Sequence, residues 1–188
     1  MAKLSKTNYT YDGETFDIGS QEARVIYAAS QDTELTTHYK VPVVSITDAT
    51  YAVTEAQSGT IFTLNKADGI VVTLPAATAG LKYEFYVETA LTSNNYTVNA
   101  ASSADTLTGM LRGIDIATLG THIDNNDAVI TTGVSIPAAA DHQLVTNKTT
   151  TGGLAGSHWV YTCITDSKWQ VSGTNICSSG ATLATPFT

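Results

Sequence analysis

The alternation of apolar and polar residues over 81–90 (LKYEFYVETA) constrains this chain more than any other feature of its sequence. Tyr83, Phe85 and Val87 fall on one face of an extended strand, and the residues between them fall on the other face. A strand with one apolar and one polar face is typical of an antiparallel sheet that buries one side. Only the segment around Ser20 carries a pattern that a short helix would also satisfy. We therefore predict an all-β fold: an antiparallel β-sandwich, a jelly roll or a short barrel.

Further strands are indicated by β-branched and aromatic residues separated by turn signals. They are predicted at 41–46, 51–54, 59–65, 70–74, 96–100 and 128–132. Asp68 and Gly69 supply the positive φ of a tight turn, so the strands on either side are expected to form a hairpin. Pro75 then ends the second of these strands, because proline cannot donate a hydrogen bond to a neighbouring strand.

The segment SHWVYTCITDSKWQVSG near the C-terminus predicts the clearest hairpin. A symmetric turn at 165–168 pairs Ile164 with Trp169 and Thr162 with Val171, which places these four side chains on one face. An aromatic side chain packs well against a β-branched cross-strand neighbour, so this face is expected to stabilise the sheet.

Residues 1–45 differ from the rest of the chain, because they are polar, carry a large share of the charge and show little alternation. We expect them to form an extended N-terminal arm that becomes ordered on assembly, with the β domain at 46–188. The alternative is that they supply two edge strands of the same domain.

The charge balance bears on the kind of partner that the chain can bind. Its net charge is −8, its isoelectric point is about 4.7, and its nine lysine and arginine residues form no cluster. Binding to a phosphate backbone or to an anionic membrane needs several cations acting together. We therefore expect neither a nucleic-acid nor a membrane partner. The opening MAKLSKTNYTYDGETF has no apolar stretch of the kind found in signal peptides, which predicts synthesis in a cytoplasm.

The sequence carries no residue pattern that is typical of a hydrolytic enzyme. A nucleophile elbow would read G-x-S-x-G, and no such stretch occurs. Ser157 and His158 are neighbours, but adjacent residues of a strand point to opposite faces. Glu84 and Glu88 lie roughly 13 Å apart along a strand, whereas the two carboxylates of a glycosidase lie about 5–9.5 Å apart. We interpret them as part of a solvated face with Lys82, and we expect no catalytic residue and no enzyme activity.

Two further sets of residues could bind a metal or react. The stretch DNND at 124–127 offers oxygen ligands that calcium prefers, but it lacks EF-hand spacing, and an ordinary turn is the alternative. Cys163 and Cys177 cannot make a four-ligand zinc site by themselves. They are interpreted as free, small apolar residues, with a late disulfide or a catalytic thiol as alternatives. In the predicted hairpin Cys163 faces Gln170, which does not bring it to Cys177. We expect no metal and no cofactor.

Residues 53–87 carry a resemblance to virion proteins of tailed bacteriophages. In these proteins a T-x-x-x-S-G stretch leads a strand, a TLP strand follows, and GLKYEF resumes the sheet. The corresponding residues here are Thr54, Ser58 and Gly59, then 73–75, then 80–85. The segment 156–173 is similar to the closing hairpin of the same proteins, with Ser157 where an acidic residue is common.

The proteins that the chain resembles include head decoration proteins, head fibres and tail fibres, and the resemblance implies a homotrimer. A fibre would need a long repetitive shaft, whereas a short β domain with a polar arm suits a cap on a capsid lattice. We therefore expect a capsid decoration (cement) protein on the capsid exterior of the virion, which binds the major capsid protein and stabilises its lattice. The glycines at 109, 113, 120 and 133 suit bends and close packing at a three-fold axis.

Two other functions stay open. A tail-fibre or head-fibre protein that binds a receptor or a sugar would need an exposed aromatic platform, for which Trp159 and Tyr161 are the candidates. A virion depolymerase would need a buried pair of carboxylates or an activated nucleophile in a cleft.

Overall fold

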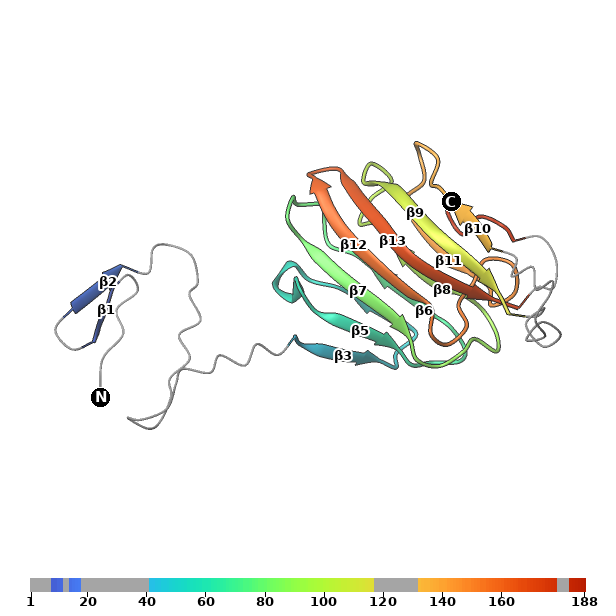
Figure 1. The fold of residues 1–188 in the computed structure, drawn as a ribbon, viewed down its shortest axis with the longest axis horizontal. Coiled ribbons are helices and arrows are strands. Elements are labelled where there is room, and N and C mark those ends of the chain that lie inside the picture. Colours follow the sequence, from blue (N-terminus) through green and yellow to red (C-terminus); the bar gives the residue numbers. More distant parts are fainter. Residues whose placement is uncertain (1–7, 12–13, 18–40, 117–131, 179–182) are drawn as a thin grey trace, which may run out of the picture. The chain divides into compact units, whose positions relative to one another are not determined.

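The computed structural model describes residues 8–11, 14–17, 41–116, 132–178 and 183–188. The chain divides into two units, Met1–Lys40 and Val41–Thr188. In the first unit, β1 (Asn8–Tyr11) and β2 (Glu14–Asp17) pair as an antiparallel hairpin (Figure 1). The segment around Ser20, where a short helix or strand was predicted, lies outside the described residues.

The regular secondary structure described in the second unit consists almost entirely of β-strands, which confirms the predicted all-β class. Its described residues hold one short helical turn, the 3-10 turn η1 (Glu55–Gln57), and no helix that is long and apolar enough to cross a bilayer. The larger sheet has seven strands in the order β10 (Thr132–Ser135), β9 (Thr106–Asp115), β13 (Lys168–Cys177), β12 (His158–Thr165), β7 (Lys82–Val87), β5 (Ile61–Leu64) and β3 (Val43–Ile46). The smaller sheet has four strands in the order β11 (Gln143–Thr146), β8 (Tyr96–Asn99), β6 (Ile70–Thr73) and β4 (Thr50–Ala52).

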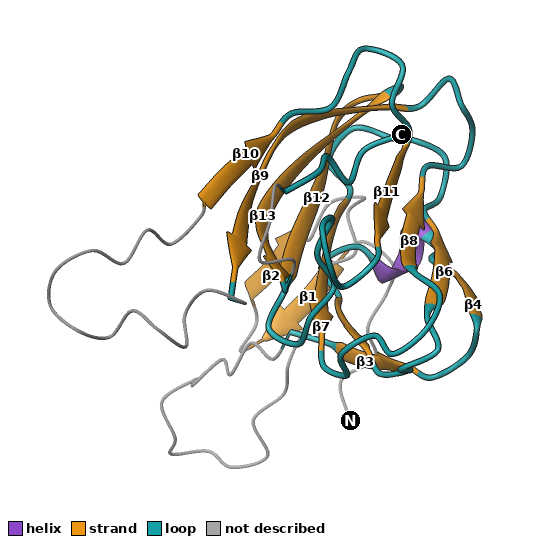
Figure 2. Cartoon of the chain, turned by 90° about the vertical axis from the view of Figure 1, so that its right-hand side faces the viewer, coloured by secondary structure: helices purple, strands orange, loops and turns teal. Residues whose placement is uncertain are grey.

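The two sheets lie as two layers, and the chain crosses repeatedly from one to the other (Figure 2). From β3 to β8, every odd-numbered strand belongs to the larger sheet and every even-numbered strand to the smaller one. A chain that crosses over and returns re-enters its first sheet in the same direction, so the neighbours β3, β5 and β7 are parallel, as are β4, β6 and β8. The sheets are therefore mixed, and the expectation of an antiparallel fold is wrong for this part of the chain.

The turn at Asp68 and Gly69 exists, but it does not make the predicted hairpin. Gly69 has a φ of 90°, and its N–H donates to the carbonyl oxygen of Lys66 at 3.1 Å. The strands on either side, β5 and β6, lie in different sheets. A side chain at position 69 would place Cβ 2.5 Å from the backbone oxygen of Asn95, so glycine is required by close packing as well as by its φ.

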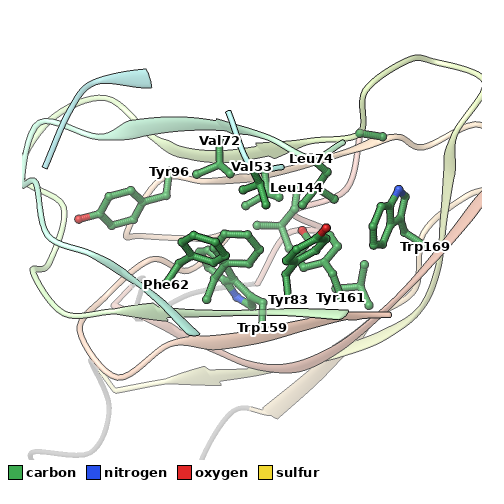
Figure 3. Packing of buried hydrophobic residues seen from close by; sticks show 14 of the residues in the cluster. Val53, Phe62, Val72, Leu74, Tyr83, Tyr96, Leu144, Trp159, Tyr161 and Trp169 are labelled. Atoms are coloured by element: carbon green, nitrogen blue, oxygen red, sulfur yellow. The ribbon is translucent and has the colours of Figure 1, made fainter. Parts of the chain in front are cut away.

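A single apolar core fills the space between the two sheets (Figure 3). Tyr83, Phe85 and Val87 on β7 are buried and alternate with more exposed residues, which confirms the predicted pattern of this strand. Phe85 stacks on Phe62 with ring centroids 5.3 Å apart and meets Tyr161 edge-on at 5.6 Å. Aromatic pairs of this kind contribute about 0.5–1.5 kcal/mol each beyond the area that they bury.

The β12–β13 hairpin forms where it was predicted, but in a different register. Cys163 lies opposite Trp169 and Thr165 lies opposite Lys168, which leaves Ile164 as an extra residue on β12. The predicted pairing of Ile164 with Trp169 is therefore wrong by one residue. A β-bulge accounts for the difference, because it places two residues of one strand against one residue of the other.

The bulge decides which side chains of β12 enter the core. A shift of one residue exchanges the two faces of a strand. Thr162 consequently pairs with Gln170 rather than with the predicted Val171. Trp159 and Tyr161 are fully buried, whereas Ile164 is 45% exposed on the outer side.

Candidate interaction surface

The outer face of the seven-stranded sheet carries an apolar cluster at its β10 edge. Met110 on β9, Val134 on β10 and Ile136 just after β10 are 59%, 63% and 69% exposed. Arg112 and Ser172 flank these side chains and are also exposed. We call Met110, Arg112, Val134, Ile136 and Ser172 the β10 patch.

Strand pairing brings the members of the β10 patch together from three parts of the chain. Val134 lies opposite Arg112 in the antiparallel β10–β9 pair, and Met110 lies beside Ser172 in the parallel β9–β13 pair. The surface is hollowed by about 340 Å³ between these residues and the glycines at 133 and 173. Gly173 has a φ of 143°, and a Cβ there would lie 2.1 Å from the backbone oxygen of His158, so no side chain can fill this part of the hollow.

The β10 patch lies on an edge strand. Among the described residues, β10 pairs with β9 and with no other strand. An edge strand presents unpaired backbone N–H and C=O groups, and apolar side chains beside such an edge favour association with another chain. Arg112 is the charged residue that lines the hollow, and no described carboxylate lies within ion-pair distance of it. The patch is thus apolar with one positive charge, on a chain of net charge −8.

The part of the outer face over β7 and β12 has a different character, and we call Lys82, Glu84, Tyr86 and His158 the polar half. Lys82 Nζ lies 2.8 Å from Glu84 Oε1, and His158 Nε2 lies 3.7 Å from Glu84 Oε2. The rings of Tyr86 and His158 stack with centroids 4.1 Å apart. The hydrogen bond from Lys82 holds the pKa of Glu84 below its ordinary value. The predicted solvated face with Lys82 is confirmed for Glu84.

Ser157 and His158 do not form a nucleophile and base pair. Ser157 is fully buried, and its Oγ accepts a hydrogen bond from the backbone N–H of Ile176 at 2.9 Å. His158 lies on the outer face, where it meets Tyr86 and Glu84. The two side chains therefore lie on opposite faces of the sheet, as the sequence predicts.

Both cysteines are buried free thiols. The Sγ of Cys163 donates to the backbone oxygen of Thr165 at 3.1 Å. Burial raises the pKa of the Cys163 thiol, and burial together with the nearby charge of Asp115 raises the pKa of Cys177 to about 11. A raised pKa disfavours the reactive thiolate. The structure thus supports the interpretation of two small buried residues rather than a catalytic thiol.

The candidate metal ligands at 124–127 lie outside the described residues. Within the described ranges, no group of three or more His, Cys, Asp and Glu side chains is placed to hold a metal ion.

Trp159 and Tyr161 cannot form the exposed aromatic platform that a sugar-binding protein was expected to need. Both are fully buried in the core, and the Trp159 Nε1 donates to Asn175 Oδ1 at 2.9 Å. This expectation is wrong because the bulge in β12 sets the register that buries them. Among the described residues, Tyr86 is the large aromatic side chain that is exposed, and it is 38% exposed on the outer face.

The glycines at positions 109, 113, 120 and 133 were expected to allow close packing at a subunit axis. At the described positions, contacts within one chain account for them. Gly109 has a φ of 102°, and a Cβ there would lie 2.2 Å from the backbone oxygen of Val171. Gly113 and Gly133 lie opposite each other across β9 and β10, and a Cβ at Gly113 would lie 2.8 Å from Leu183 Cδ1. Position 120 lies outside the described residues.

The β10 patch was not predicted from the sequence, although part of its signal is there. A strand was expected at 128–132, but within the described residues β10 covers Thr132–Ser135. Val134 and Ile136 alternate with Ser135, which is the period-2 pattern of a strand. No sequence pattern places Met110 beside them, because that contact depends on the pairing of β9 with β10 and β13.

A comparison of the chain with protein-family models, with curated proteins and with solved structures found no match. The proposals that follow therefore rest on the sequence resemblance and on the geometry of the outer face.

Proposed function

We propose that this chain is a capsid decoration (cement) protein of a tailed bacteriophage, and that its two sheets form a β-sandwich. It binds the major capsid protein on the exterior of the head as a homotrimer. The β10 patch is the observation that supports assembly into a homotrimer, since exposed apolar side chains at a sheet edge with a polar surround mark a protein–protein interface. The assignment to a virion, and to the major capsid protein as partner, comes from the sequence resemblance.

Stabilisation of the capsid follows from mass action. A protein that binds the assembled lattice and not its separated subunits raises the free energy of disassembly. The first unit, Met1–Lys40, can add contact area if it becomes ordered on binding. The acidic balance of the chain suits a position away from packaged DNA. This function requires no catalytic residue, cofactor, nucleic acid or membrane.

The test is co-sedimentation of the full chain with undecorated capsids of the phage that encodes it. We expect saturable binding and a higher temperature of capsid rupture in the decorated particles. A native mass of about 59 kDa by light scattering, three times the chain mass of 19.8 kDa, would support the trimer. Absence of binding to capsids by a correctly folded chain would refute the decoration function.

A second candidate is a head-fibre or tail-fibre protein that binds a receptor sugar. Tyr86 favours it, because an exposed aromatic ring beside the Glu84 carboxylate and the His158 imidazole offers both stacking and hydrogen bonds. Titration of the chain with host-surface oligosaccharides would test it by calorimetry. Binding that is lost in Tyr86→Ala but kept in the control Ile164→Ala would support the fibre function.

A further inference from the structure

The β10 patch has the properties of a surface that another chain covers. Met110, Val134 and Ile136 are each more than half exposed, and they adjoin a strand edge that no described strand pairs with. Exposed apolar side chains at an edge strand promote aggregation unless a partner covers them. The hollow of about 340 Å³ provides room for side chains of that partner.

The β1–β2 hairpin is a segment that needs a partner. It has two strands of four residues each and belongs to neither sheet of the β domain. An isolated two-stranded hairpin is marginally stable at best in water, and a third strand or a packed face makes it stable. The hairpin therefore depends on a surface outside its own eight paired residues.

The composition of the hairpin complements that of the β10 patch. The two strands contain Tyr9, Tyr11 and Phe16, together with the carboxylates Glu14 and Asp17, and no lysine or arginine. The hollow of the patch is lined by Met110, Val134, two glycines, Ser172 and Arg112, with no carboxylate. Aromatic residues suit the apolar part of the hollow, and the acidic residues suit Arg112, which has no ion-pair partner among the described residues.

The proposed homotrimer makes the patch of a neighbouring copy, rather than the patch of the same chain, the docking site. The arm joins the β domain at β3, and β3 and β10 are the opposite edges of the seven-stranded sheet. Six inter-strand steps of about 4.8 Å separate the two edges, or about 29 Å. The residues from 18 to 42, between β2 and β3, can span this distance within one chain as well, since an extended chain covers about 3.3–3.6 Å per residue, and the mixing experiment below separates the two cases.

We propose that the β1–β2 hairpin of one copy docks on the β10 patch of a neighbouring copy and extends its sheet, so that the ring closes by exchange of arms. This inference rests on the proposed homotrimer. The contact is head-to-tail, and contacts of that type form closed rings when the rotation between copies closes. Main-chain hydrogen bonds to the β10 edge supply affinity, and the hollow and Arg112 supply specificity.

The first experiment measures native mass for three full-length variants by light scattering. Val134→Glu introduces a charge into the patch, and Thr10→Pro removes a backbone donor from β1. We expect the wild-type mass of about 59 kDa to fall about threefold in each, to 19.8 kDa. Ile164→Glu is the matched control, because it places the same charge on an exposed apolar residue outside the patch, and it keeps the wild-type mass.

The second experiment mixes the two defective variants. Val134→Glu retains an intact hairpin, and Thr10→Pro retains an intact patch, so one productive contact can form between them. We expect a two-chain complex of about 40 kDa, twice 19.8 kDa, that neither variant forms alone. A mixture that stays monomeric, as docking of each hairpin on its own chain would require, overturns the proposal.

Other outcomes are equally decisive. A Thr10→Pro variant with the wild-type mass, or a monomeric wild type, overturns arm exchange. Circular dichroism checks that each variant is folded, and Ile136→Glu replaces Val134→Glu if the latter is not. Capsid co-sedimentation is scored separately: binding without arm exchange leaves the decoration function intact, and arm exchange without capsid binding leaves this inference intact.

Discussion

The two parts of the outer face of the seven-stranded sheet differ in how their side chains are satisfied. In the polar half, Glu84 contacts both Lys82 and His158, and the His158 ring stacks on Tyr86. In the β10 patch, apolar side chains surround an arginine that no described carboxylate pairs with. Both parts follow the same strand alternation, so only the contacts of their side chains distinguish a surface with charged and stacked pairs from a surface of exposed apolar groups.

The largest expected effect is a difference in the free energy of unfolding between a substitution in the core and one on the outer face. Trp159→Ala removes a fully buried side chain, and we expect it to lower the free energy of unfolding by about 3–5 kcal/mol. His158→Ala, the adjacent residue in the polar half, should cost less than about 1 kcal/mol. Denaturant titration measures both. Equal losses would mean that the polar half holds the fold together and is not merely a solvated surface.

A smaller effect is expected where the two parts of the face meet. Gly173→Ala forces a Cβ to 2.1 Å from the His158 carbonyl oxygen at a φ of 143°, and we expect a loss of about 1–3 kcal/mol. Ser172→Ala, on the exposed side of the same strand, should stay within about 0.5 kcal/mol. Thermal unfolding of the two variants tests this. A stable Gly173→Ala variant would show that the floor of the hollow can move.

The smallest effect concerns the charges of the polar half. The pKa of Glu84 is lowered from about 4.5 by Lys82, so ionised Glu84 stabilises the folded state above its unfolded pKa. Glu84→Gln should therefore lose less than about 1 kcal/mol at pH 7. The difference should vanish as the pH falls through the lowered pKa that Glu84 has in the folded state. Unfolding curves from pH 3 to pH 7 measure it, and a difference that grows on acidification would contradict the assigned cause.

The class of fold and the pattern of single strands could be predicted, but strand pairing could not. Asp68 and Gly69 carry the same turn signal as Asp12 and Gly13, yet the strands beside the first pair lie in different sheets and those beside the second form a hairpin. Asp12 and Gly13 could have predicted that hairpin within the proposed arm. The predicted boundary at residue 45 falls inside β3. Turn chemistry reverses the chain, and burial decides which sheet receives the next strand.

The candidate site shows the same division. The polar half follows from alternation in β7, because one strand supplies Lys82, Glu84 and Tyr86. The β10 patch combines residues of three strands, and only the register of these strands brings its members together. One extra residue at Ile164 was enough to reverse the predicted exposure of Trp159.

By itself, the sequence determined that the chain is rich in strands, that β7 buries Tyr83, Phe85 and Val87, and that Ser157 and His158 point apart. These properties depend on neighbours along the chain, and the period of a strand is a local matter. Only the tertiary structure decided that the sheets are mixed and that an apolar hollow opens at the β10 edge. Strand pairing depends on which apolar faces can be buried together. The free energy of this burial depends on contacts across the whole domain, and not on neighbours along the chain.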